Sequence, residues 1–434
     1  MWLQLRKRDS IKIAITALTV ALVGASNARA ADQDQVESSV LIYKETDRVS
    51  AAEGILGISK HLRGEYLLGL RLTYDGLTGA SPNGATPASR VQTFTRPSGN
   101  GAYTAQPGQT PLDDTFKDTR IAVDGNLGKT LGRMTQLTAG IHFSTEHDYS
   151  SFGLSGGIAQ DFFKKNTTLG FSGSYSRDAV SPEGGAPVPF GVMRPSSGGG
   201  EHEGDDDDEG EGGPSEAKDV VDGIISLNQV VDRSTIIRLN YSFNHSSGYL
   251  TDPYKLLTVV ENSSSANPGA PESYVYEKRP DSRTKHALFG EVRRYLGGNT
   301  LDLSYRYFWD DWGSTSHTAD LFFDWQIKNG HGIEPHIRWY SQSEADIHRY
   351  FLVSGEQLPQ YASADSRLAK FDALTLGLTY SLPLDALSHL HISAEYYTQM
   401  GDKSPPEAFG ELRQFELFPK MNALMLRLGY TRDF

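Results

Sequence analysis

The chain has 434 residues, of which 41 are Lys or Arg and 54 are Asp or Glu, so its formal net charge is -13. This acidic balance argues against nucleic acid as a partner, because phosphate backbones attract basic surfaces. The absence of cysteine excludes c-type haem attachment, thiolate-bound iron–sulfur clusters and catalytic thiols.

The first thirty residues have the pattern of a secretory signal. Four basic residues lie between Arg6 and Lys12, an apolar run follows from Ile13 to Val23, and Ala28-Arg29-Ala30 is a small-residue cleavage site. We predict a signal peptide over residues 1–30 that is cleaved near Ala30. No later apolar run approaches the roughly 18 to 20 residues that a membrane-spanning helix needs.

The mature chain alternates apolar and polar residues with period two, which is typical of strands. Such runs occur at 137–143, 237–243, 301–309, 374–380 and 390–396. In LDLSYRYFW, Leu301 to Trp309, every second residue is leucine or aromatic, while Asp302, Ser304 and Arg306 lie between them. One face of such a strand suits an apolar environment and the other face suits water.

Connections between these runs are of two kinds. Short Gly-, Asn- and Asp-rich turns follow the even-numbered strands, and every long Gly-, Pro- and Ser-rich connection follows an odd-numbered strand. We predict long surface loops near 79–117, 179–217, 248–283, 347–364 and 401–418. The count is about sixteen strands, with fourteen to eighteen allowed by the element boundaries.

This pattern predicts an all-β protein: a transmembrane, antiparallel, up-and-down β-barrel in the outer membrane of a Gram-negative cell. A bilayer admits a sheet only if the sheet closes on itself, because every backbone polar group must be satisfied internally. Leu301, Leu303, Tyr305, Tyr307 and Trp309 are then expected to face lipid.

By the same alternation, a set of charged residues is expected to face the lumen: Asp302, Arg306, Asp310, Glu334, His336, Arg338 and Glu395. Mixed charge indicates either a water-filled channel or an interior closed by ion pairs. The density of Arg and Asp favours pairs that bridge the lumen.

A second charged set lies in and beside two predicted loops: Asp113, Asp114, Lys117, Asp118, Arg120, Asp252 and Lys255. Porin-type barrels often fold a loop inward, where opposed acids and bases narrow the pore. Ordinary loop-to-loop packing explains the same residues equally well.

The acidic tract over residues 201–216 contains His202 among nine acidic residues. Its carboxylates suit hard cations, but the ligand spacing of a calcium loop is missing. A solvated loop tip is the favoured interpretation.

No catalytic, cofactor-binding or metal-binding residue is predicted, and we do not expect an enzyme. Ser316 and His317 in STSHTAD resemble parts of a hydrolase triad, but adjacent strand residues point to opposite faces. The histidines are scattered and show no metal-ligand spacing.

The last strand, ALMLRLGYTRDF, alternates and ends on Phe434, which resembles the signal that the barrel-assembly machinery recognises. Arg432 departs from the apolar residue usual at the third position from the end.

Several segments resemble those of a family of bacterial barrel proteins, domain of unknown function 3570: LTGASPNGATP, QTFTRPSGNGAYT, TPLDDTFKDTR, GYLTDPYKLLTVV, YVYEKRPDSRTKHAL, DLSYRYFWDDWGSTSHTADL and SPPEAFGELR. The resemblance covers essentially the whole mature chain and implies an outer-membrane barrel without an assigned activity. Members are often encoded near envelope redox genes, which hints at envelope redox proteins as partners.

The expected function is a porin-like conduit for small polar solutes or ions. A structural sleeve or docking platform for envelope redox proteins is the alternative, and an outer-membrane hydrolase is a third hypothesis. The expected partners are therefore outer-membrane lipid, the barrel-assembly machinery and, in the alternative, those redox proteins.

Overall fold

The computed structural model describes residues 34–63, 65–96, 101–182, 184–193 and 215–434. The predicted signal peptide and residues 201–214 of the acidic tract lie outside these ranges. Among the described residues, no helix is long and apolar enough to cross a bilayer.

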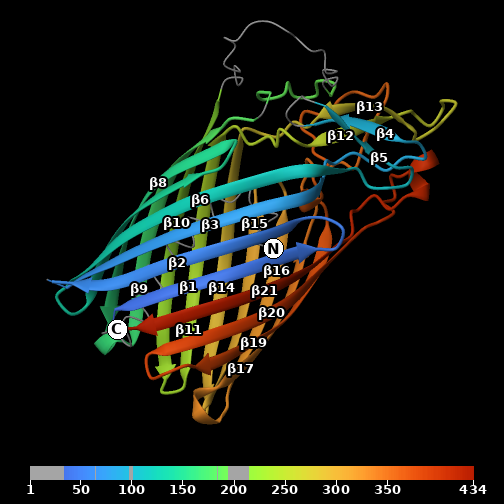
Figure 1. Ribbon diagram of the computed structural model, residues 1–434. Helices are drawn as coiled ribbons and strands as arrows, with labels where there is room; N and C mark the ends of the chain where they lie inside the picture. Colours follow the sequence, from blue (N-terminus) through green and yellow to red (C-terminus); the bar gives the residue numbers. More distant parts are fainter. Residues whose placement is uncertain (1–33, 64, 97–100, 183, 194–214) are drawn as a thin grey trace, which may run out of the picture.

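Within the described ranges, sixteen strands form one closed barrel (Figure 1). They are β1 (Gln35–Glu45), β2 (Ser50–Leu62), β3 (Tyr66–Pro82), β6 (Leu112–Leu131), β7 (Thr135–Thr145), β8 (Tyr149–Phe162), β9 (Thr167–Val180), β10 (Glu216–Asp232), β11 (Thr235–Gly248), β14 (Ser282–Leu296), β15 (Asn299–Asp310), β16 (Thr315–Gln326), β17 (Gly332–Gln342), β19 (Phe371–Pro383), β20 (Ser388–Gly401) and β21 (Met421–Asp433).

Each barrel strand pairs antiparallel with the next, and β1 closes the sheet against β21. The seam runs from Gln35 opposite Asp433 to Glu45 opposite Ala423, without a register shift. Closure leaves no strand edge unpaired, which is the condition for a sheet in lipid. The predicted all-β, up-and-down barrel of about sixteen strands is confirmed.

The outer face of the barrel carries an apolar belt. On β15, Leu303 is 53% exposed and Tyr305 is 48% exposed. The register places Leu303 opposite Leu321, Leu321 opposite Ile337, and Ile337 opposite Leu376, so that exposed apolar side chains form a row across four strands. In water such a surface would be unfavourable, since apolar exposure costs about 25 cal/mol per Å².

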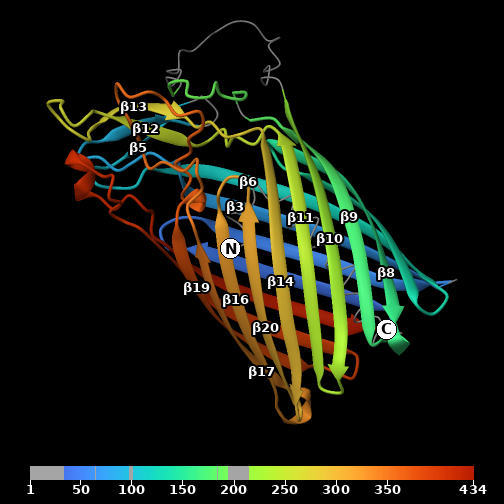
Figure 2. The ribbon, with the colours of Figure 1, turned by 180° about the vertical axis from the view of Figure 1, so that it is seen from behind.

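The short turns lie at one end of the barrel (Figures 1 and 2). Between β14 and β15 only Gly297 and Gly298 make the connection, with φ values of 62° and 112°. Both residues occupy the left-handed half of backbone space, which glycine adopts without steric cost and which tight hairpins require. Two other short turns contain the 3₁₀ helices η1 (Phe163–Lys165) and η2 (Lys328–Gly330).

Several of the long connections at the opposite end contain short strands and 3₁₀ helices in their described parts (Figures 1 and 2). We call the described residues of the connections after β3, β9, β11, β17 and β20 the cap. Its elements are β4 (Gln92–Thr95), β5 (Ala102–Ala105), β12 (Leu256–Val260), β13 (Pro271–Tyr276), β18 (Leu352–Val353), η3 (Ser366–Leu368) and η4 (Gly410–Gln414).

The cap has its own sheets and apolar core. Strands β13, β12 and β18 form one sheet in that order, and β4 pairs with β5. Leu257, Val275, Leu352 and Ala362 are buried together, although they come from two connections that are far apart in the sequence. This shared core holds the cap together over the mouth of the barrel.

Candidate functional site

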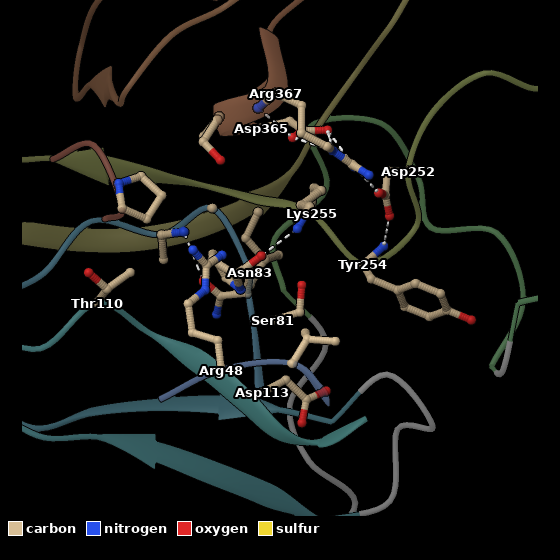
Figure 3. Close-up of a pocket in the computed structure, with 18 of the residues that line it drawn as sticks. Arg48, Ser81, Asn83, Thr110, Asp113, Asp252, Tyr254, Lys255, Asp365 and Arg367 are labelled. Carbon is tan, nitrogen blue, oxygen red and sulfur yellow. Dashed lines mark hydrogen bonds and ion pairs between the residues drawn. The ribbon is translucent and has the colours of Figure 1, made fainter. Parts of the chain in front are cut away.

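A cavity lies where the cap meets the wall of the barrel, and we call it the mouth cavity (Figure 3). It offers about 160 Å³ to water-sized molecules, whereas a single water needs about 10–15 Å³. The charged residues of its lining are Arg48, Asp113, Asp118, Glu146, Asp252, Lys255, Asp365 and Arg367. A second cavity of about 70 Å³ adjoins it, since Glu146, Asp252 and Tyr254 line both.

The segment from Asp252 to Lys255 is held in a turn at the edge of both cavities. The Asp252 carboxylate accepts a hydrogen bond from the Tyr254 backbone at 3.1 Å, and the Asp252 backbone N–H donates to Glu277 at 2.7 Å. The Tyr254 hydroxyl donates to Asp148 on the barrel side. These bonds fix where the next side chain, Lys255, enters the mouth cavity.

Lys255 is the cationic side chain near the middle of the mouth cavity (Figure 3). Its ammonium donates to the backbone carbonyl of Pro82 at the end of β3. Burial lowers the pKa of Lys255 below the ordinary lysine value of 10.5, because the charged form loses its hydration. The nearby carboxylates of Asp252 and Asp365 act in the opposite direction.

Those carboxylates belong to a buried ionic network in the cap. The Arg279 guanidinium pairs with Glu277 and, at 2.9 Å, with Asp365. Arg367 pairs with Asp365 at 2.6 Å and with Asp252 at 3.0 Å. Side chains of Arg279 and Glu277 are 0% exposed, so each charge depends on its partner for compensation.

Three carboxylates at the barrel side of the cavity lie close together. Oxygen atoms of Asp118, Glu146 and Asp148 are all within 4.8 Å of one another, which is close enough to hold one cation. Asp148 accepts the Tyr254 hydroxyl, and the Arg120 guanidinium lies 4.0 Å from Glu146. These contacts offset part of the negative charge, and the group adds an acidic side to the mouth.

Below the cap, ion pairs follow the lumen wall instead of crossing it. Some of them reach over a glycine on the intervening strand. Glu37 on β1 passes over Gly57 of β2 to pair with Arg71 on β3 at 3.0 Å. A Cβ at Gly57 would lie 2.6 Å from Glu37, so only glycine leaves the space that this pair uses.

His336 makes the same kind of contact on the other side of the seam. Its ring stacks on Phe322 at 3.9 Å and lies between Asp320, 3.1 Å from Nε2, and Glu395, 3.0 Å from Nδ1. Glu395 reaches it over Gly377 of β19. His336 on β17 therefore has both partners on the barrel wall: Asp320 is on the neighbouring strand β16, and Glu395 is on β20, two strands away.

The structure places the seven predicted lumen residues on the inner face. Asp302 pairs with Arg293 at 2.7 Å, Asp310 with Arg283, and Arg338 with Asp320 at 2.5 Å. Arg306 lies over the inward ring of Phe289, and Glu334 lies among Asp302, Asp324 and His336. In the described part of the chain these pairs join strands that are close together on the wall, whereas the density of Arg and Asp had favoured pairs that bridge the lumen.

Of the seven predicted constriction residues, Asp113, Asp118, Asp252 and Lys255 line the mouth cavity together. Arg120 pairs with Asp75 at 3.0 Å, Lys117 is exposed, and the side chain of Asp114 lies outside the described part of the chain.

One feature of this prediction is wrong: Asp113 to Arg120 do not form an inward loop but belong to β6, a wall strand. Strands β3 and β6 continue beyond the apolar belt, where an outward residue need not be apolar, so the alternation that reveals a strand is lost there.

The sequence interpretation missed Glu277, Arg279, Asp365 and Arg367. Their only signal was the concentration of charge in YEKRPDSR, inside the predicted loop 248–283, and in ASADSR, at the end of the predicted loop 347–364. These charges are buried as pairs because two connections pack together, as when Arg279 meets Asp365, 86 residues later in the sequence. No local sequence pattern reveals such a contact.

A family model described as "Protein of unknown function (DUF3570)" matches residues 11–432. No curated protein matches.

Solved structures similar in fold include three outer-membrane proteins. The "CymD monoaromatic hydrocarbon channel" is 9% identical with a TM-score of 0.41, and 97% of this chain and 94% of that chain are covered. OccK5 (OpdH) of Pseudomonas aeruginosa is 10% identical with a TM-score of 0.40, and 93% of this chain and 98% of that chain are covered. A "Bacterial polysaccharide outer membrane secretin" is 7% identical with a TM-score of 0.46, and 93% of this chain and 99% of that chain are covered. At these low values the likeness carries no argument about what passes or binds.

Proposed function

Because the chain belongs to the DUF3570 family of proteins of unknown function, we propose its function from its own residues: an outer-membrane channel for small polar solutes or ions, with the mouth cavity as its selective entrance. The observation that carries the proposal is the pairing of an apolar outer belt with a charged inner wall beneath a polar cavity.

Membrane insertion is supported by the outer belt. The closed sheet satisfies its own backbone, and the exposed leucine, isoleucine and aromatic side chains suit hydrocarbon. In this family of folds the short turns face the periplasm and the long connections face outward, so the cap would lie on the cell surface.

Passage through the barrel is supported by the course of the ion pairs. Pairs such as Glu37–Arg71 and Arg293–Asp302 lie along the wall, where their charges remain hydrated on the lumen side. Selection is supported by the mouth cavity, which combines Lys255 with carboxylates from β6 and from the connection between β7 and β8. Its size suits small molecules rather than chains.

Single-channel recording in planar bilayers tests the proposal. Folded, purified protein is expected to give discrete conductance steps in potassium chloride, and small polar solutes are expected to enter protein-containing vesicles in a swelling assay. Folded protein that inserts into the bilayer but shows neither steps nor swelling would refute a channel.

Lys255→Met is expected to shift the channel toward cations. Loss of one positive charge among carboxylates changes the energy of a permeating ion by about 1 kcal/mol at ~4 Å in water, which is about a fivefold change in the cation-to-anion permeability ratio. Reversal potentials in a salt gradient measure this permeability ratio.

The selectivity of the wild-type channel should also depend on pH. Because burial lowers the pKa of Lys255, its ammonium should lose its charge at a pH below 10.5. As the pH rises, the wild-type channel should therefore become more selective for cations, and the Lys255→Met variant should not.

Lys117→Met provides the matched control. Lys117 lies on the same strand, β6, as Asp118, but it is exposed and outside the mouth cavity. The Lys117→Met variant therefore removes one positive charge, as Lys255→Met does, but leaves the lining of the mouth cavity unchanged. An equal shift in both variants would show that overall charge, not the cavity, sets the selectivity.

A further inference from the structure

Three neighbouring histidines mark the upper edge of the apolar belt on one side of the barrel. On β11 the outward residues run Phe243, His245, Ser247, and on β14 they run Leu288, His286, Thr284. On β16 they run Ala319, His317, Thr315. In each strand, apolar side chains give way to a histidine and then to a hydroxyl in the direction of the cap.

These positions are outward because their neighbours are inward. Asn244 and Ser246, which flank His245, are buried in the interior, and so is Ser316 beside His317. Leu288, two residues from His286, is 50% exposed on the belt. The three histidines therefore lie at the level where the belt meets the polar surface.

All three rings are oriented in the same way, with Nδ1 against a hydroxyl on a neighbouring strand. The pairs are His245 with Thr284 at 3.1 Å, His286 with Tyr241 at 2.9 Å, and His317 with Tyr305 at 2.6 Å.

Aromatic packing holds two of these rings further. The His286 ring stacks on Trp309 with centroids 5.1 Å apart, Trp309 stacks on Tyr307, and Tyr307 lies 5.2 Å from His317. The result is a continuous row of rings across β14, β15 and β16, with little freedom to turn.

Such an orientation leaves Nε2 as the nitrogen directed away from the hydroxyl. When a hydroxyl donates to Nδ1, the neutral imidazole carries its proton on Nε2 and presents an N–H donor. Protonation adds positive charge without removing that donor. The natural partner of a row of N–H donors beside an apolar surface is an anionic oxygen carried on a lipid.

We propose that His245, His286 and His317 bind phosphate groups of lipids in the outer leaflet, with the aromatic row and the belt below it packing against the acyl chains. The inference rests on the membrane orientation proposed above, and it adds a lipid site that is separate from the mouth cavity. Its readout is lipid binding, so it can fail while the channel function stands.

Thermal unfolding of the detergent-solubilised protein, followed by circular dichroism, tests the site with diphosphorylated lipid A as the probe. Binding to the folded state raises the unfolding midpoint. The variant with all three histidines replaced by phenylalanine (H245F/H286F/H317F) keeps the rings but removes the donors, and its apparent affinity for the lipid is expected to be at least roughly tenfold weaker. The single variants H286F and H317F should each show part of the loss, which covers the case that the triple variant folds poorly.

His391→Phe is the matched control. His391 also places Nδ1 against a hydroxyl, that of Ser381 at 2.8 Å, but it lies on β20 on the lumen side. It should bind lipid A as the wild type does. Equal midpoint shifts in the wild type and the triple variant, or an equal shift with the dephosphorylated lipid, would overturn the proposal. A comparable shift from inorganic phosphate alone would assign the site to free anions instead of lipid.

Discussion

Replacing Leu303 by arginine is expected to destabilise the folded barrel in a bilayer by about 2–4 kcal/mol, whereas arginine at the adjacent Ser304 should change stability by less than about 1 kcal/mol. Leu303 is 53% exposed in the middle of β15, on the belt. Ser304 faces the lumen, where a guanidinium stays hydrated and Asp320 lies directly opposite on β16.

Reversible unfolding in vesicles, by urea or guanidinium titration, measures both variants. The two substitutions introduce the same side chain at adjacent residues, on opposite faces of one strand. A difference in stability between the variants therefore reports the environment of each face. Equal destabilisation by both would contradict the assignment of lipid and lumen faces, and with it the account of a transmembrane barrel.

Replacing Arg279 by methionine is expected to disorder the cap. Its guanidinium is 0% exposed and pairs with Glu277 and Asp365, both buried. Removing one partner of a buried ion pair typically costs about 3–5 kcal/mol, because an uncompensated charge remains. The cap should loosen while the barrel strands keep their hydrogen bonds, since the Arg279 guanidinium donates to Glu277, Ser363 and Asp365, which all belong to the cap.

Limited proteolysis detects the loss as new cleavage within residues 249–281 and 343–370, and bilayer recordings should show noisier and larger conductance steps. Arg349→Met is the control, because Arg349 lies exposed in the same cap and its guanidinium donates to the backbone carbonyls of Asp346 and His348. A further variant, E277Q in the R279M background, removes the stranded charge of Glu277 and should restore much of the protection, since Asp365 keeps Arg367 as its partner. An R279M cap as resistant as the wild type would mean that the network does not hold it.

The local pattern of the chain determined the barrel. Period-two alternation, as in Leu301 to Trp309, is a property of residues side by side in the sequence, and it persists because the bilayer imposes the same outer face on every strand. Turn chemistry is equally local: the adjacent Gly297 and Gly298 favour a tight hairpin, and both adopt the positive φ values that such a turn requires. Strand number and topology followed from these signals.

Part of the mouth could also be predicted. Asp252 and Lys255 in DPYKLL and Asp113 and Asp118 in TPLDDTFKD were grouped by charge, and the structure brings all four to one cavity. The means by which they meet could not be predicted, because Asp113 and Asp118 reach the mouth on a wall strand that extends past the belt.

Only the tertiary structure decided what the long connections do and which charges pair. Arg279 and Asp365 meet across 86 residues of sequence, and Glu37 reaches Arg71 because the register of β1, β2 and β3 sets Gly57 between them. The row of histidines likewise exists only because three strands align at one height. A chain of alternating residues specifies the faces of its strands, but neighbours across a sheet and contacts within a cap arise when distant segments exclude water together.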